Sequence, residues 1–270
     1  MAHKSDKTRK SPVFSIKNVG KCRRKSRRSK SSCLPSKILN TIPETSKKMC
    51  QEGQDHCLLD KVIGLSEQDK KYYRSILRPR YPQEWKNDPD SWLDNFQIES
   101  VLKQYSEDYP FFKFLGVQPI DFSAPDPYSR EKKCLSETMC NIKLQEEYDA
   151  GYRGLGAVFN LDPHFKGGSH WVGLYINIKN IHRPKICYFD SYGMKTPRLI
   201  ARLMKSFLLQ NRHCELCYNA RRFQFSNTEC GMYSMFFIIA MLSGISFKEF
   251  CRRAIPDRDM YELRHILFQE

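Results

Sequence analysis

Residues 223–233 read Phe-Gln-Phe-Ser-Asn-Thr-Glu-Cys-Gly-Met-Tyr. This pattern predicts a strand end, a short polar turn and a cysteine that opens an apolar helix ending near Leu242. At a helix N-terminus, unpaired backbone N–H groups and the positive end of the helix dipole favour the nucleophilic thiolate over the thiol. Gly231 leaves room beside the sulfur for a substrate backbone. Cys230 is therefore a candidate nucleophile, although a free cysteine is more often a small buried apolar residue.

The charge of the chain is uneven along its length. The 270 residues carry a formal net charge of +15, and residues 1–37 hold 13 Lys and Arg against one acidic residue. The hydrophobic content of 40% is ample for one packed domain. The N-terminus lacks the apolar core of a secretory signal, and no run approaches the roughly 20 apolar residues that cross a bilayer. We therefore expect a soluble protein made in the cytosol.

The 11 cysteines are scattered without an evident framework. We expect them to be reduced thiols of an intracellular protein rather than disulfides. His213, Cys214 and Cys217 form half of a zinc-like cluster, but no second pair lies at a suitable spacing, so we predict no metal site. The chemistry that the sequence indicates needs no cofactor.

Three regions are expected. Residues 1–48 are rich in Lys, Arg and Ser, and a segment with so few large apolar residues is typically disordered. Residues 49–88 are expected to form an accessory helical region, with Ser66 as a helix N-cap. Residues 89–270 are expected to form the globular domain.

The basic tail contains a cluster typical of nucleic-acid binding or nuclear import. A solubilising tail without a fixed partner is an equal alternative. Binding to DNA would depend on salt, and deletion of residues 1–37 tests it. The candidate nucleic-acid-binding residues are Arg23, Arg24, Lys25, Arg27 and Arg28.

Within the globular domain, a helix is predicted over 98–105 and strands over 156–160, 171–178, 185–189 and about 217–225. Further helices are predicted after Thr196-Pro197 and over 255–268. Strands interspersed with helices favour an α+β fold, in which a small, mostly antiparallel sheet packs against the Cys230 helix.

Four polar residues fall at the edges of these elements: His170, Asp190, Gln224 and Cys230. A thiol nucleophile needs a base and a group that orients the base, roles that fit His170 and Asp190. The amide of Gln224 and the backbone N–H of Cys230 could stabilise an oxyanion. Taken singly, each residue also has a structural explanation: a strand-end histidine, an Asx-turn or an exposed polar side chain.

Together these blocks resemble the adenain/Ulp-type cysteine peptidases, a papain-like family of SUMO- and NEDD8-specific proteases and viral maturation proteases. The matching blocks are Gly168-Ser169-His170-Trp171, Tyr188-Phe189-Asp190-Ser191, and Gln224 with Cys230-Gly231 and Tyr233. Glu229 replaces the aspartate usual in cellular members, which keeps the charge. Residues 255–268 and 228–231 resemble in particular the polyprotein-processing proteases of African swine fever virus and related large DNA viruses.

The resemblance, which covers about residues 90–268, implies a Cys-His-Asp peptidase with an acyl-enzyme intermediate. It implies cleavage after Gly-Gly, because a narrow tunnel roofed by an aromatic residue admits only glycine. Trp171 suits that roof and Trp92 a second wall. The candidate substrate-binding residues are Trp171, Trp92, Asn227 and Gly231.

The leading hypothesis is a viral maturation protease whose partner is a structural polyprotein with Gly-Gly-Xaa sites. We expect it in the virion and at cytoplasmic virus factories of the host, with the nucleus as the alternative that the basic tail allows. A SUMO- or ubiquitin-like-modifier isopeptidase is the second hypothesis, and a basic nucleic-acid-binding virion protein is the third.

Overall fold

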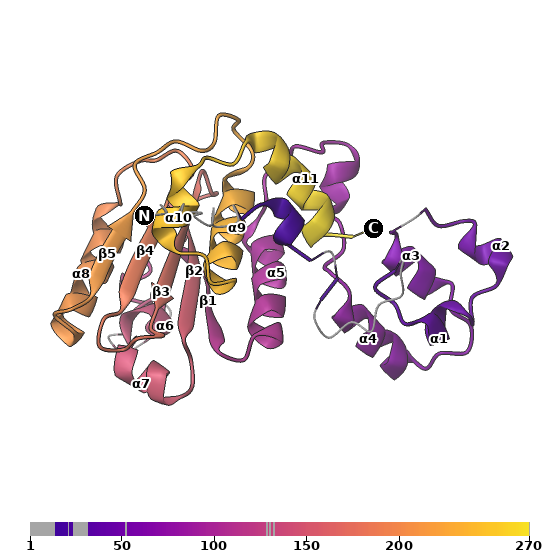
Figure 1. Ribbon diagram of the computed structural model, residues 1–270, viewed down its shortest axis with the longest axis horizontal. Helices are drawn as coiled ribbons and strands as arrows, with labels where there is room; N and C mark the ends of the chain where they lie inside the picture. The colour runs from indigo at the N-terminus through magenta and orange to yellow at the C-terminus, as the bar shows by residue number, and fades with distance from the viewer. Residues whose placement is uncertain are drawn as a thin grey trace, which may run out of the picture.

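A five-stranded sheet forms the centre of the protein (Figure 1). This computed structural model describes residues 14–20, 22–23, 32–51, 53–127, 129, 131 and 133–269. The strands follow one another across the sheet in chain order: β1 (Phe112–Pro119), β2 (Gly154–Asn160), β3 (Trp171–Asn177), β4 (Lys185–Phe189) and β5 (Glu215–Tyr218). The three central strands pair antiparallel, and the two edge strands pair parallel to their neighbours. The predicted α+β class is confirmed.

The helical elements lie before, between and after the strands. In chain order they are η1 (Ile16–Asn18), α1 (Ser36–Leu39), α2 (Glu44–Lys47), α3 (Asp55–Asp60), α4 (Glu67–Ile76), η2 (Gln83–Lys86), α5 (Asn95–Asp108), α6 (Glu137–Cys140), α7 (Leu144–Asp149), α8 (Arg198–Gln210), α9 (Cys230–Leu242), α10 (Phe247–Arg252) and α11 (Asp257–Leu267).

Both faces of the sheet are buried. Along β3, Val172, Leu174 and Ile176 join a cluster that includes the buried side chains of α8, as their alternation predicts. Trp171 and Tyr175 point into the other cluster, which includes α5, α9 and α11. All 13 residues of α9 are buried, so the predicted Cys230 helix is the central helix of the molecule.

One strand was not predicted and another was predicted too long. The β1 residues lack a period-2 burial pattern, because the register shifts between Phe114 and Val117 around Gly116, whose φ is +90°. At the other edge, β5 ends at Tyr218 rather than near 225. The Asn219 side chain accepts from the Asp190 backbone N–H (2.9 Å) and donates to the Asp190 carbonyl (2.7 Å), which takes the place of further strand pairing.

The N-terminal region is more ordered than its composition predicts. The short helices α1 and α2 fall inside the segment expected to be a disordered tail, and they lie beside α3 and α4 (Figure 1). A small apolar cluster is shared across the expected boundary at residue 48; its buried members are Cys33, Leu34, Ile38, Ile42, Leu59, Val62 and Leu77. A few well-spaced apolar residues therefore build a core that the average composition conceals.

The described residues 14–19, which precede α1, pack on the globular domain. Phe14, Ile16 and Val19 are buried in the same cluster as α9, and the ring of Phe14 lies 5.2 Å from that of Phe236. Residues 1–13 lie outside the described residues.

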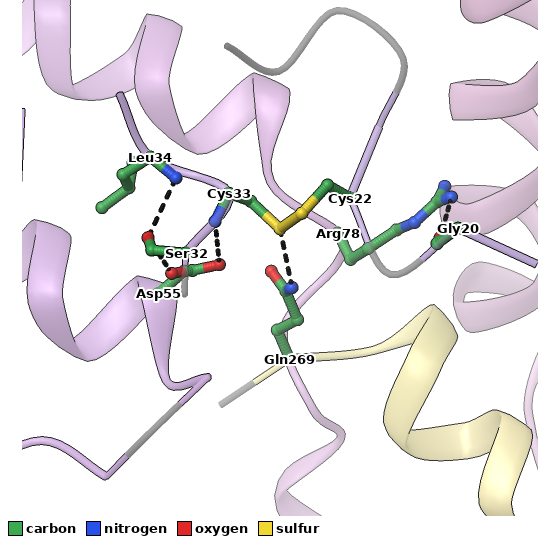
Figure 2. Close-up of a disulfide and its surroundings, with 8 residues drawn as sticks. All are labelled: Gly20, Cys22, Ser32, Cys33, Leu34, Asp55, Arg78 and Gln269. Atoms are coloured by element: carbon green, nitrogen blue, oxygen red, sulfur yellow. Dashed lines mark hydrogen bonds between the residues drawn. A yellow bond between two sulfur atoms is a disulfide. The ribbon is translucent and has the colours of Figure 1, made fainter. Parts of the chain in front are cut away.

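The expectation that all cysteines are reduced thiols is wrong for this structure. Three disulfides join Cys22 to Cys33, Cys50 to Cys57 and Cys134 to Cys140. Each pair is only 6 to 11 residues apart in sequence, so local turns bring the sulfur atoms together without a long-range framework. Figure 2 shows the Cys22–Cys33 bond, where the Gln269 amide lies 3.5 Å from the Cys33 sulfur.

Within the described ranges, the helices are all too short or too polar to cross a lipid bilayer.

The packing of α9 on β3 yields a test of stability. A Cβ added at Gly173 would lie 2.7 Å from the Phe237 ring, so in Gly173→Ala the ring or the helix α9 that carries it must shift. We expect a loss of about 1–3 kcal/mol in the free energy of unfolding, as for other overpacked cores. Gly167→Ala is the control, because nothing lies within 4 Å of its added Cβ. Equal urea midpoints for the two variants would contradict this packing.

Candidate active site

The nucleophile candidate begins the central helix. Cys230 is the first residue of α9, and only 2% of its surface is exposed. The helix lies on the sheet beside β3, so the cysteine is brought to the end of β3 where His170 precedes the strand. The first residue of α9 and the residue before β3 therefore lie at the same edge of the domain.

His170 and Asp190 are brought together by strand pairing. His170 immediately precedes β3 and Asp190 immediately follows β4, and these strands run antiparallel with Gly173 opposite Phe189. His170 Nε2 lies 2.8 Å from Asp190 Oδ1. The predicted base and its orienting carboxylate are thus hydrogen-bonded.

The electrostatics of His170 favour its charged form. Burial of the imidazole opposes ionisation, but hydrogen bonds to Asp190 and Cys230 and their charges outweigh burial. They raise the pKa of His170 from 6.5 to about 9. Because Nε2 is bonded to Asp190, Nδ1 is the nitrogen left for the Cys230 sulfur. At neutral pH the imidazole is therefore protonated beside the sulfur and can give a proton to a leaving group.

Asp190 is held rigidly. It is 1% exposed, and its backbone is bonded on both sides by the Asn219 amide. Its Oδ1 also accepts the backbone N–H of Tyr192 at 2.8 Å. Asp190 therefore forms the Asx-type turn weighed as the structural alternative, and it orients His170 at the same time.

Gln224 lies in a loop rather than at a strand end, and it is completely buried. Its Oε1 accepts the Ser191 hydroxyl at 2.6 Å, and its Nε2 donates to the Ser226 carbonyl at 2.9 Å. The amide is therefore fixed within the loop that leads to Cys230. Its role in an oxyanion hole stays a prediction.

The two tryptophans named from the sequence line one groove of about 530 Å³. Trp171 is 6% exposed, and its indole N–H donates to the Leu93 carbonyl at 3.0 Å. Trp92 is 47% exposed. The groove is lined by Trp171, the residue after His170, but by neither His170 nor Cys230. It is also lined by Asp94, Gln118, Asn160, His164, Lys166 and Gly168.

Gly231 lies against the segment that carries Trp92. A Cβ added there would lie 3.1 Å from Leu93 Cδ1 and 3.4 Å from Ile98 Cδ1. The absent side chain therefore lets α9 pack against the segment that carries Trp92. The role of Gly231 in substrate binding stays a prediction. Asn227 is exposed in the loop before Cys230, where its contact with substrate stays a prediction.

Arg23 does not fit the predicted nucleic-acid-binding surface. It is 4% exposed, and its guanidinium is paired with Asp108 at 2.9 Å and Glu107 at 2.8 Å on α5. An arginine whose donors are used internally is not available to phosphate groups. The other members of that cluster, Arg24, Lys25, Arg27 and Arg28, lie outside the described residues.

A buried ion pair behind the nucleophile was missed. Glu229, 3% exposed, is bound by Arg264 of α11, which is fully buried, at distances from 2.9 to 3.1 Å. The arginine also donates to the Ser91 carbonyl at 2.9 Å and so joins α9, α11 and the Trp92 segment. The sequence contained a signal that Arg264 is buried. Arg264 shares the helical face of Met260 and Leu267, where an apolar residue is expected.

Among the residues that the structure describes, no three His, Cys, Asp or Glu side chains are grouped to hold a metal ion.

The fold and this site are those of a cysteine protease. In sequence, the chain is similar to a thiol protease of Acanthamoeba polyphaga mimivirus (26% identity over 240 residues, 86% of this chain and 74% of the relative). It is also similar to a SUMO-1 cysteine protease of African swine fever virus (28% over 255 residues, 89% of this chain and 92% of the relative).

The fold agrees with these relatives. The crystal structure of an African swine fever virus protease superposes with a TM-score of 0.68 at 22% identity, over 92% of this chain and 95% of the other. A model of the YopJ serine/threonine acetyltransferase family also matches residues 131–263, a range that holds His170, Asp190, Gln224 and Cys230.

The His170–Asp190 pair makes stability depend on pH. Because the pKa of His170 is raised in the folded state, the pair stabilises the fold fully below pH 6.5, and this contribution is lost as the pH rises through about 9. We expect the difference in unfolding free energy between wild type and Asp190→Asn to fall by about 1–3 kcal/mol from pH 6 to pH 10.

Denaturant titrations at both pH values measure this difference, and Asp88→Asn, an exposed position, is the control. If the difference in unfolding free energy does not change with pH, the pKa of His170 is not raised by Asp190.

Proposed function

We propose that this protein is a viral cysteine endopeptidase that cleaves structural polyprotein precursors after Gly-Gly during virion maturation. The observation that carries the proposal is the hydrogen bond between His170 and Asp190 at the edge where Cys230 begins α9. A groove walled by two tryptophans beside this edge supports a peptide substrate.

The proposed mechanism uses the three side chains in order. The Cys230 thiolate attacks the scissile carbonyl carbon, and the His170 imidazolium gives its proton to the leaving amine as the C–N bond breaks. The acyl group then remains on sulfur as a thioester. Water, deprotonated by the now neutral His170, attacks the thioester, and the carboxylic acid leaves as the sulfur is freed. Asp190 keeps the imidazole oriented and stabilises its charge throughout.

The groove supports preference for a slender substrate. The buried Trp171 and the half-exposed Trp92 line the same groove, and the indole N–H of Trp171 donates to the Leu93 carbonyl. Two aromatic side chains on one groove favour residues without side chains next to the cleaved bond. Selection of Gly-Gly follows from this constraint and from the resemblance to the viral proteases.

Two other acyl-transfer functions share this chemistry. One relative is described as a SUMO-1 cysteine protease, which favours a modifier isopeptidase as the second function. The match to the acetyltransferase family favours transfer of an acyl group to a hydroxyl in place of water. All three functions would form a thioester on Cys230, so the substrate and the acceptor distinguish them.

A matched substrate panel tests the proposal. It contains a polyprotein fragment with a Gly-Gly-Xaa site, SUMO and ubiquitin fusions, and a serine-containing peptide with an acetyl thioester donor. We expect wild type to cleave the polyprotein fragment, with a loss of at least about a thousandfold in Cys230→Ala. Cys214→Ala, which removes another free thiol, should keep full activity.

Each alternative has its own outcome in the panel. Faster cleavage of a SUMO or ubiquitin fusion than of the polyprotein fragment would replace the maturation protease by an isopeptidase. Acetylation of the serine peptide without cleavage would replace it by an acetyltransferase.

A further inference from the structure

Tyr192 is a residue of the site to which the triad chemistry assigns no role. It lies two residues after Asp190 and is only partly buried. Its ring stacks on the imidazole of His170, with the ring centroids 4.7 Å apart and the planes inclined by 24°. This separation and tilt are typical of attractive offset stacking.

Three further contacts fix the tyrosine in this position. Its backbone N–H donates to Asp190 Oδ1 at 2.8 Å, the same oxygen that His170 Nε2 approaches. Its hydroxyl donates to the Ser226 carbonyl at 3.2 Å, in the loop before Cys230. The Gln224 amide lies 3.4 Å from the same hydroxyl. The backbone of Tyr192 is therefore bonded to Asp190, and its hydroxyl is bonded to the loop that precedes Cys230.

The stacked ring has an electrostatic consequence. The face of an aromatic ring carries negative potential and attracts a cation more strongly than a neutral group. His170 changes between these two states during the reaction. A tyrosine ring against its face therefore stabilises the imidazolium and limits rotation of the imidazole away from the sulfur.

We propose that Tyr192 is a positioning residue of this active site, whose ring holds His170 in line with Cys230 and favours its protonated form. This inference rests on the proposed peptidase function for its catalytic meaning. Tyr192 acts through His170 and is assigned no contact with substrate.

The other charged groups around His170 act alongside the ring. Asp190, from the end of β4, and Cys230, from α9, both favour the imidazolium. On the tyrosine itself, the Arg222 guanidinium lies 5.3 Å from the ring centroid, and Asp257 contributes a negative charge. Burial, followed by the charge of Cys230, raises the pKa of the Tyr192 hydroxyl, so the phenol stays neutral while His170 titrates.

Two substitutions separate the ring from the hydroxyl. Tyr192→Phe keeps the stacked face and removes the bond to Ser226, whereas Tyr192→Leu removes the face and keeps an apolar side chain. The ionisation of His170 is followed by NMR of histidine-labelled protein, with its signal assigned by its absence in His170→Gln. This readout needs no substrate and is therefore independent of the proposed function.

We expect wild type and Tyr192→Phe to titrate near the same pH, about 9, and Tyr192→Leu to titrate about half to one pH unit lower. In cleavage assays, Tyr192→Leu should lose about tenfold or more in kcat with little change in KM. Tyr192→Met is a second variant without a ring, for use if Tyr192→Leu does not fold.

An unchanged His170 titration in both ring-less variants, with kcat within twofold of wild type, would overturn the inference. An equal downward shift in Tyr192→Phe and Tyr192→Leu would also overturn it, because the hydroxyl rather than the ring would then be responsible. Failure of wild type to cleave any substrate, together with a lowered His170 pKa in Tyr192→Leu only, would reject the proposed function and leave the tyrosine contact established.

Discussion

The proposed active site depends on one hydrogen bond, between His170 Nε2 and Asp190 Oδ1. It exists because β3 and β4 pair antiparallel in a register that places the start of one strand beside the end of the other. Desolvation alone would keep His170 neutral, and the paired carboxylate reverses that preference. The register of β3 and β4 therefore holds His170, the proposed base, in its protonated form.

The proposed nucleophile, Cys230, is held by side-chain packing rather than by strand pairing. The helix α9 is buried along its whole length, and its first turn is pressed against Leu93 at Gly231, where no side chain intervenes. Behind it, the buried Glu229–Arg264 pair joins the start of α9 to the C-terminal helix α11. Removal of either partner would leave an unpaired buried charge, which is strongly destabilising. The C-terminal helix α11 therefore supports the proposed active site, although it contributes no reacting group.

Local patterns in the sequence predicted the parts of the fold that have strong periodicity. The β3 alternation and the fully apolar α9 are such parts, and His170, Asp190 and Cys230 were found because each stands at the edge of one. The edge strand β1 was missed because its bulge at Gly116 breaks the alternation. The contact between Gly231 and Leu93 was not predicted because Leu93 lies more than a hundred residues away in sequence. The N-terminal helices were missed since averaged composition hides a few apolar residues that meet only in three dimensions.

Among the five free cysteines, Cys230 is the one proposed as the activated nucleophile. This role is tested most directly with a peptide that ends in Gly-Gly and carries a C-terminal vinyl sulfone, which forms a stable thioether with an attacking thiolate. Peptide mapping by mass spectrometry after labelling at neutral pH locates the modified residue. We expect a single adduct on Cys230 that forms far more slowly in His170→Ala. Labelling spread over Cys214, Cys217 and Cys251, with Cys230 unmodified, would contradict it.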